Sequence, residues 1–313
     1  MASNAKWPAA AVTVALIVLG SACSSASGGQ SLPALGTVPA VTSSTQLSRP
    51  IDAYLAQADD VKQYEKAQDV LADACMKTFG LSGLPTVDIG LDEAAAKRNT
   101  STALYGYFDT AADPSKGYDR VSVDDPSTPQ SRPNMSAVQE VEYGRDSTTG
   151  ELATAYQGRP IPAGGCQKSA AQEIGSPRPA LFVQALPAGG PQVPTTDPRL
   201  TAANSQWSSC MAKQGFQYAS PEAAFLDPKW APPPGASTAV VKQFTHTPAE
   251  VATTKADIGC KISTGYMGTV VALESAYDDQ YIAKYGSQLS TLKADLAGLR
   301  KKAAQIITSD RNG

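Results

Sequence analysis

Cysteine is the residue whose spacing most clearly suggests chemistry in this sequence of 313 residues. Cys75 in "ACMKTFG" and Cys210 in "SCMAKQGF" are each followed by Met, and a glycine comes four residues after that Met. Cys166 in "AGGCQKSA" and Cys260 in "DIGCKIST" each follow a glycine directly. Four such thiols in an exported chain predict two disulfide bonds, with three possible pairings.

The fifth cysteine, Cys23, comes after a segment typical of an export signal. Lys6 precedes the 12-residue apolar run "AAAVTVALIVLG", and small residues follow it. A cationic start, an apolar run and small residues at the cleavage site are the features of a signal peptide, which we place at residues 1–22. The run is shorter than the ~20 residues that a membrane-spanning helix needs.

The cleavage region "VLGSAC" resembles the lipobox of bacterial lipoproteins, in which the cysteine after the cut is acylated. The resemblance implies that Cys23 carries the lipid, and two acyl chains hold a protein at a membrane far better than one. Lipoboxes usually place Leu three residues before the cysteine, whereas this chain has Gly20 there and Leu19 one residue earlier. The alternative is ordinary cleavage after Ala22 or Ala26, which would release a secreted protein.

Histidine- and serine-based chemistry has little support. The chain contains one histidine, His246, whereas metal sites and catalytic triads need several donors. We expect His246 to have a surface or capping role, just ahead of a helix that the capping box Thr247–Glu250 would start. The stretch "STLK", Ser290–Lys293, matches the S-x-x-K pattern, but it falls within a long predicted helix and no K-T-G follows. The sequence has no G-x-S-x-G elbow, P-loop or dinucleotide fingerprint.

Carboxylates and tyrosines give weaker signals. The adjacent pairs Asp59–Asp60, Asp124–Asp125 and Asp278–Asp279 suit solvated turns and helix faces, since glycoside chemistry needs two carboxylates at a set separation in space. The stretch "DDPSTPQSRPN" has too few well-spaced acceptors for a calcium loop. Tyrosines in "YGYFD", "EYG" and "AYQG" could form stacking surfaces for a glycan or peptide, or could equally belong to the core.

The overall composition limits the class of partner. The 26 basic and 29 acidic residues are nearly balanced and spread along the chain. The sequence therefore has no basic patch that would indicate nucleic-acid binding, which requires neutralisation of the phosphates. The 25 glycines and 23 prolines predict long irregular connections between elements.

The elements that must position the cysteines divide the chain into segments. Residues 23–47 are uncharged and predict a flexible tether after the lipidated cysteine, with a reach of about 25–30 Å. Residues 48–196 predict a first helical disulfide module, whose opening helix starts near Pro50 and stops at Gly80. Residues 197–313 predict a second helical disulfide module with a long C-terminal helix.

The second module begins with the same pattern as the first, and this favours one disulfide in each. Asp197 is the expected N-cap, with Pro198 after it and Gly215 as the stop. We favour the pairs Cys75–Cys166 and Cys210–Cys260, whose loops of about 90 and 50 residues would each contribute roughly 4–5 kcal/mol in the loop-entropy model. The rival pairing, Cys75–Cys210 with Cys166–Cys260, would tie the modules together.

After the last cysteine, apolar residues alternate at spacings of three and four. This heptad seam predicts one long helix that either packs within its own module or offers the seam to a second chain or a partner helix, with Gly286 as a possible interruption. The seam consists of Ile282, Tyr285, Leu289, Leu292, Leu296, Leu299, Ala303 and Ile306.

With its export signal, Cys23 and duplicated Cys-Met…Gly-Cys segments, the chain resembles a group of secreted lipoproteins from high-GC Gram-positive bacteria that have no assigned activity. The resemblance covers most of the mature chain. It implies an envelope-facing protein anchored through Cys23, with structural disulfides, and it carries over no catalytic residues.

The sequence therefore predicts a mainly α fold of disulfide-stapled helical modules, with long irregular Pro/Gly-rich loops and a long C-terminal helix. We expect a non-catalytic lipoprotein on the outer face of the cytoplasmic membrane, with no cofactor and no nucleic-acid partner. It would bind membrane lipid through Cys23 and an envelope protein or wall glycan elsewhere. The alternative is a cell-wall-active hydrolase using a carboxylate pair. A solute receptor ranks third, because alternating β/α patterning is lacking.

Overall fold

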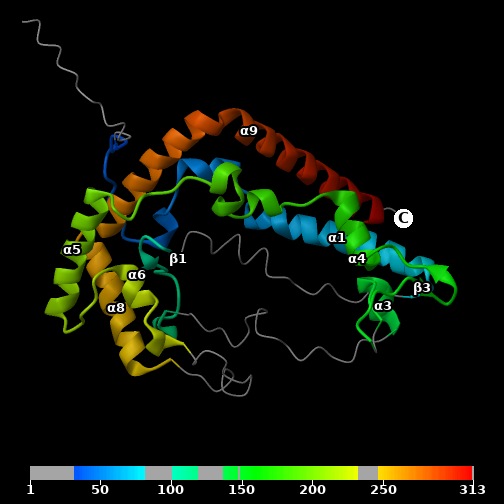
Figure 1. The fold of residues 1–313 in the computed structure, drawn as a ribbon, viewed down its shortest axis with the longest axis horizontal. Coiled ribbons are helices and arrows are strands. Elements are labelled where there is room, and N and C mark those ends of the chain that lie inside the picture. The colour runs from blue at the N-terminus through cyan, green and yellow to red at the C-terminus, as the bar shows by residue number, and fades with distance from the viewer. Residues whose placement is uncertain (1–31, 82–100, 119–136, 147–148, 232–245, 312–313) are drawn as a thin grey trace, which may run out of the picture. The chain divides into compact units, whose positions relative to one another are not determined.

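The computed structural model describes residues 32–81, 101–118, 137–146, 149–231 and 246–311 (Figure 1). These residues are mainly helical, with two disulfides and a long C-terminal helix, and this confirms the predicted fold class. The predicted signal peptide and Cys23 lie outside the described residues. The α-helices are α1 (Ala58–Thr78), α3 (Ala137–Tyr143), α4 (Gly165–Ile174), α5 (Pro198–Lys213), α6 (Pro221–Phe225), α8 (Pro248–Ser263) and α9 (Tyr266–Arg311).

The strands of the described residues are short and form two antiparallel pairs. Gly106 lets the first pair lie against α6, because a Cβ on this residue would come within 2.6 Å of the Pro221 carbonyl oxygen. The pairs are β1 (Ser101–Thr102) with β2 (Gly106–Tyr107), and β3 (Ala155–Tyr156) with β4 (Arg159–Pro160). Short 3₁₀ helices make many of the connections: η1 (Ser44–Gln46), η2 (Pro50–Tyr54), η3 (Pro114–Lys116), η4 (Arg178–Ala180), η5 (Val183–Ala185), η6 (Pro187–Gly189) and η7 (Pro228–Trp230).

The repeated Cys-Met…Gly stretches form the same helix ending. At the end of α1, Gly80 has φ +73° and the Leu81 N–H donates to the Met76 carbonyl at 3.2 Å. At the end of α5, Gly215 has φ +88° and the N–H of the next residue donates to the Met211 carbonyl at 3.0 Å. A glycine in the left-handed conformation allows the chain to turn back and satisfy a carbonyl of the last turn. The Met side chain points into the core in both cases and is fully buried.

Of the two helix starts predicted from the sequence, one is confirmed and the other is wrong. Asp197 caps α5 as predicted, and its side chain accepts the Arg199 N–H at 2.9 Å. The helix predicted to start near Pro50 is instead interrupted. Pro50 opens the 3₁₀ helix η2, Leu55 is extended, and α1 begins only at Ala58. The reason lies in the core, since Leu55 is buried in this extended conformation.

The two disulfides follow the favoured pairing. Cys75 at the end of α1 bonds to Cys166 in the first turn of α4, and Cys210 near the end of α5 bonds to Cys260 in the last turn of α8. The Cα atoms lie 5.6 Å and 5.7 Å apart, within the usual range. Each bond therefore ties together two helices that are distant in sequence.

The heptad seam of α9 is covered by the chain itself. Leu289 packs against η2, Leu296 packs against Val61 of α1, and Ala303 packs against Tyr64 further along α1. The second half of α9 thus lies along a helix of the predicted first module, which is neither of the two arrangements expected from the sequence (Figure 1). The expected interruption occurs at Tyr285, whose φ of −111° and ψ of 15° depart from helical values.

The second half of the predicted tether is part of the body. Val41 is buried in the main core cluster, and the Pro33 carbonyl accepts a hydrogen bond from Arg199 at 2.6 Å. Gly268 of α9 allows this segment to approach closely, since a Cβ there would lie 2.1 Å from the Pro39 carbonyl oxygen. By its contacts, Pro33–Gly313 forms one compact unit. The absence of charge, which suggested a tether, also suits a segment that packs on a core.

Among the described residues, no helix is both long enough and apolar enough to cross a bilayer.

Candidate functional site

Helix α8 has one face in the core and another on an open groove. Asp257, Cys260 and Lys261 on the core-facing side are completely buried. Lys255 and Gly259 on the other side are exposed. The residues between β2 and Tyr118 form a loop, here called the 107–118 loop, that lies across this second face and is fixed to α8 at both ends.

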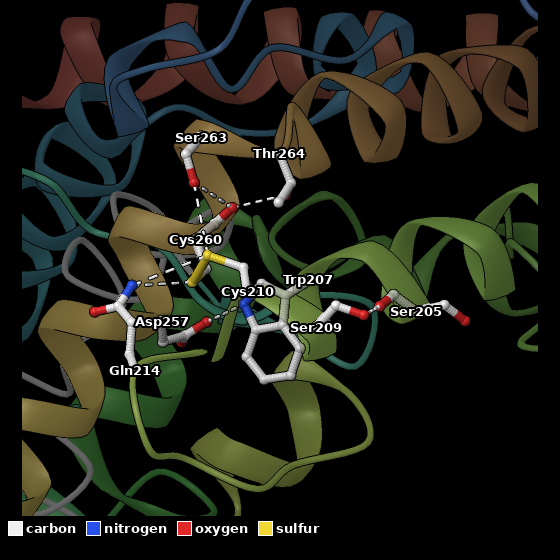
Figure 2. The surroundings of a disulfide bond; sticks show 9 residues. All are labelled: Ser205, Trp207, Ser209, Cys210, Gln214, Asp257, Cys260, Ser263 and Thr264. Atoms are coloured by element: carbon white, nitrogen blue, oxygen red, sulfur yellow. Dashed lines mark hydrogen bonds between the residues drawn. A yellow bond between two sulfur atoms is a disulfide. The ribbon is translucent and has the colours of Figure 1, made fainter. Parts of the chain in front are cut away.

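A buried ion pair holds the start of the loop. The Lys261 Nζ donates to Asp257 Oδ2 and to the Tyr107 carbonyl, both at 2.7 Å. The Trp207 indole N–H donates to Asp257 Oδ1 at 3.0 Å, beside the Cys210–Cys260 disulfide (Figure 2). Burial raises the pKa of Asp257 to about 6, although the ammonium opposes the shift, and burial lowers the pKa of Lys261.

A buried carboxylate holds the end of the loop. Glu250, in the first turn of α8, accepts the Tyr118 N–H at 3.1 Å on Oε1. Its two oxygens also lie 3.1 Å from His246 Nδ1. Gly117 is required beside this carboxylate, because a Cβ at its φ of +57° would lie 2.7 Å from the Glu250 Cδ. His246 therefore contacts the first turn of α8, next to the N-cap Thr247.

The predicted capping box at the start of α8 forms in one direction. Thr247 Oγ1 accepts the Glu250 N–H at 3.1 Å, as predicted. The Glu250 side chain points to His246 and Tyr118 in place of the expected contact with the cap. A residue that the pattern assigned to a helix terminus thus fixes a loop from another part of the chain.

The middle of the loop is held by its own carboxylates and by the N-terminal segment. Asp109 Oδ1 accepts the N–H groups of Ala111 and Ala112 at 2.9 Å and 3.2 Å. Thr110 Oγ1 accepts the Ser44 N–H of η1 at 3.0 Å. The groove that results has a volume of about 360 Å³ and is called the α8 groove. It is lined by Thr42, Tyr107, Asp109, Thr110, Ala112, Asp113, Pro114, Gly117, Thr254, Lys255, Ile258, Gly259 and Ile262.

A second groove lies between α9 and the segment after α4, and has a volume of about 390 Å³. Its walls include Pro177, Pro179, Leu292 and Leu299, with Lys302 at its edge. Both linings combine apolar side chains with charged ones, here Asp295 and Lys302. In the α8 groove, Asp109 and Asp113 are fixed by hydrogen bonds from backbone N–H groups of the 107–118 loop. Because fixed polar groups are what give a binding site its specificity, the α8 groove is the better candidate despite its slightly smaller volume.

The adjacent carboxylates noted in the sequence do not act as pairs. Asp60 binds Arg300 at 2.6 Å, and Asp278 is buried against Arg49 at 2.5 Å. Their neighbours Asp59 and Asp279 are exposed or partly exposed. The pair Asp124–Asp125 lies outside the described residues.

Two other sequence signals also have structural explanations. Ser290 of the S-x-x-K stretch donates to the Gly286 carbonyl within α9 at 2.8 Å, and Lys293 lies over the Tyr54 ring at 5.5 Å. The aromatic residues of "YGYFD" are core residues, with Tyr105 and Tyr107 exposed by only 2% and 7%, although Tyr107 also lines the α8 groove. Their spacing in a short hairpin could not show which side faces inward.

Two charge clusters were missed from the sequence. Arg49 donates to Glu274 Oε1 at 3.1 Å and to both oxygens of Asp278, and so joins the chain before η2 to α9. Asp69 of α1 lies near Glu142 of α3, and burial together with that carboxylate raises the pKa of Asp69 to about 6. The spacing of four between Glu274 and Asp278 was a detectable signal, but their partner is 225 residues away.

No protein family model, no curated protein and no solved structure matches this chain. Among the described residues, no group of three or more His, Cys, Asp or Glu side chains is arranged to hold a metal ion. The interpretation of the α8 groove therefore depends on its own geometry.

Proposed function

We propose that this chain is a non-catalytic binding or accessory lipoprotein of the bacterial cell envelope, exported and anchored to the outer face of the cytoplasmic membrane through Cys23. Its partner is a membrane complex or a cell-wall component, and the α8 groove is where it binds. The resemblance to secreted lipoproteins of unknown activity supports the compartment. The two disulfides, which persist in oxidising surroundings, support it as well.

The observation that carries the binding role is the fixation of the 107–118 loop by buried charges. Lys261 and Glu250 are both fully buried, and each binds a backbone group at one end of this loop. Burying an ion pair gives little net stability compared with apolar residues of the same size, because the desolvation cost offsets the attraction. We therefore explain the arrangement by the need to hold the 107–118 loop in one conformation. A groove with a rigid wall loses less conformational entropy when a ligand binds, and this favours a binding role.

The distance from the anchor restricts where the partner lies. Nine residues separate Cys23 from Pro33, the first residue of the compact unit. A fully extended chain of this length spans at most about 35 Å. Because residues 33–47 pack on the body, this length limits how far Pro33 can lie from the proposed anchor, in place of the whole predicted tether.

Site-specific photo-crosslinking on intact cells tests the proposal. A photoreactive amino acid replaces Lys255 in the α8 groove, and a matched variant carries it at Lys301, an exposed position of α9. We expect a discrete envelope product from position 255 and none from 301. Equal products from both positions, or products of cytoplasmic proteins only, would contradict a binding role for this groove.

The anchor is tested separately by metabolic labelling with palmitate. We expect the label on the wild-type chain and its loss in Cys23→Ala, with release of the protein into the medium. Label that persists without Cys23 would show that the anchor has been assigned to the wrong residue.

The alternative function, a wall-active hydrolase using a carboxylate pair, is favoured by one observation. The raised pKa of Asp69 next to the buried Glu142 is the kind of shift that a proton-transferring carboxyl requires. Release of sugar from purified cell walls by the wild type, abolished in Asp69→Asn, would support the hydrolase over the binding protein.

A further inference from the structure

Gly259 leaves the floor of the α8 groove open at a cost in helix stability. Glycine inside a helix is less favourable than alanine by about 1 kcal/mol. Gly106 and Gly117 are needed because a Cβ would collide with neighbouring atoms, but a Cβ on Gly259 would meet nothing within 4 Å. No contact in the described part of the chain therefore requires a glycine at this position. What the missing side chain provides is space between Ile258 and Ile262 in the groove.

Five backbone N–H groups of the 107–118 loop already have acceptors within the chain. The Asp109 carboxylate and Ser44 hydroxyl accept the N–H groups of residues 110, 111 and 112. Asp113 accepts the N–H groups of Ser115 and residue 116, through its side chain and its carbonyl, respectively. Peptides are usually recognised by addition of a strand or by insertion of a helix, and the former needs free backbone groups. Because these N–H groups are already bonded, the side chains of the groove are the polar groups that we expect to hold a ligand.

The side chains available suit a ligand rich in hydroxyl groups. The carboxylates of Asp109 and Asp113 can accept hydrogen bonds, and the exposed Lys255 can donate them. The Ser115 N–H and hydroxyl lower the pKa of Asp113, which keeps it ionised. The partly buried Ile258 and Ile262 offer an apolar surface between these polar groups. Sugar rings combine an apolar C–H face with hydroxyl groups around the edge, and they match this arrangement.

We propose that the α8 groove binds a saccharide, specifically the glycan chain of the cell wall, with one sugar face on the floor at Gly259 and the hydroxyls directed to Asp109 and Asp113. This inference depends on the proposed function, of which it specifies the ligand class. Charge-assisted hydrogen bonds from sugar hydroxyls to carboxylates supply the orientation, and the apolar floor supplies contact area.

The test uses the exported full-length protein, purified in detergent, and a soluble β-1,4-linked N-acetylglucosamine oligosaccharide as the probe in calorimetric titrations. Gly259→Leu fills the floor, and we expect it to weaken binding by at least about tenfold. Gly298→Leu is the matched control, because Gly298 is also inside a helix with open space around it, and it lies in the other groove. Leu favours helix far more than Gly, so neither variant should lower the melting temperature.

The outcomes separate the ligand class from the function. Binding by the wild type and by Gly298→Leu, with loss in Gly259→Leu, supports the inference. Equal binding by all three proteins overturns the assignment to this groove. If free wall peptides bind and the oligosaccharide does not, or if position 255 crosslinks only to a membrane protein, the saccharide is wrong while the binding role stands. If nothing binds and nothing crosslinks, the proposed function fails as well.

Discussion

The buried ion pair of α8 offers the most direct test of how the α8 groove is held. Replacing Lys261 by Met removes the ammonium that binds Asp257 Oδ2 and the Tyr107 carbonyl, each at 2.7 Å. Met is also long and unbranched, so that the volume stays largely filled. Asp257 is then a buried carboxylate that keeps its hydrogen bond from the Trp207 indole N–H at 3.0 Å.

The expected loss of stability comes from the Asp257 carboxylate, which stays buried after Lys261 has been replaced. Removing one member of a buried ion pair costs about 3–5 kcal/mol, because the other charge remains in the interior without compensation. The Tyr107 carbonyl also loses the hydrogen bond from Lys261, which adds about 1 kcal/mol. The double variant Asp257→Leu/Lys261→Met has neither charge of this pair, and we expect it to recover most of the loss, apart from the cost of the Trp207 N–H that loses its acceptor.

Urea unfolding followed by circular dichroism, with disulfides intact, measures these values at pH 5 and pH 8. Burial raises the pKa of Asp257 to about 6 in the wild type, and removal of Lys261 raises it further. A carboxyl whose pKa is higher in the folded than in the unfolded protein loses stability as the pH rises between those two values. The cost of Lys261→Met should therefore be smaller at pH 5, where Asp257 is protonated, than at pH 8.

Two results would refute this reasoning. One is a loss of less than about 1 kcal/mol in the free energy of unfolding of Lys261→Met at pH 8, which is the size expected for an ion pair at the surface. The other is a double variant no more stable than the single one, which would show that Lys261 stabilises the fold by something other than compensating Asp257.

Three further perturbations test other parts of the structure. Burial raises the pKa of Glu274 to about 7, so its ionisation should remove up to about 3 kcal/mol of stability as the pH rises from about 4.5 to 7. The change in the free energy of unfolding caused by Glu274→Gln should therefore be more favourable at pH 8 than at pH 5 in urea titrations, and an equal change at both values would contradict the raised pKa of this carboxyl. Leu296→Ala should cost about 3 kcal/mol by the same measurement, because the side chain is buried against Val61, and no loss would show that the seam faces solvent. Replacing Cys210 and Cys260 together by Ala should cost about 4 kcal/mol for a loop of 50 residues, and a cost near zero would mean that the bond does not form in solution.

The features predicted correctly from the sequence are those set by residues close together in the chain. The ends of α1 and α5 depend on a glycine that can adopt positive φ and on the carbonyls of the preceding turn. The start of α5 depends on Asp197 and the proline after it. The pairing of the cysteines was favoured because the helix ends containing Cys75 and Cys210 looked alike, which is also local information.

The features that were missed depend on contacts between distant residues. Nothing near Lys261 indicates that its ammonium binds the Tyr107 carbonyl, 154 residues earlier, although its spacing of four from Asp257 on one helix was visible. The seam containing Leu296 was recognised, but its periodicity is the same whether the covering helix belongs to this chain or to another. Only the fold shows that α1 covers it.

The N-terminal segment connects the proposed anchor to the proposed binding site. Val41 is buried in the core, Thr42 lines the α8 groove, and the Ser44 hydroxyl lies 3.3 Å from Asp109 Oδ1. The chain that leaves Cys23 toward the body therefore becomes part of the groove about 20 residues later. A mobile tether would let a binding site turn freely relative to the membrane. Because this segment packs along the body and contacts the 107–118 loop, its described part does not act as such a tether and instead forms part of the wall of the α8 groove.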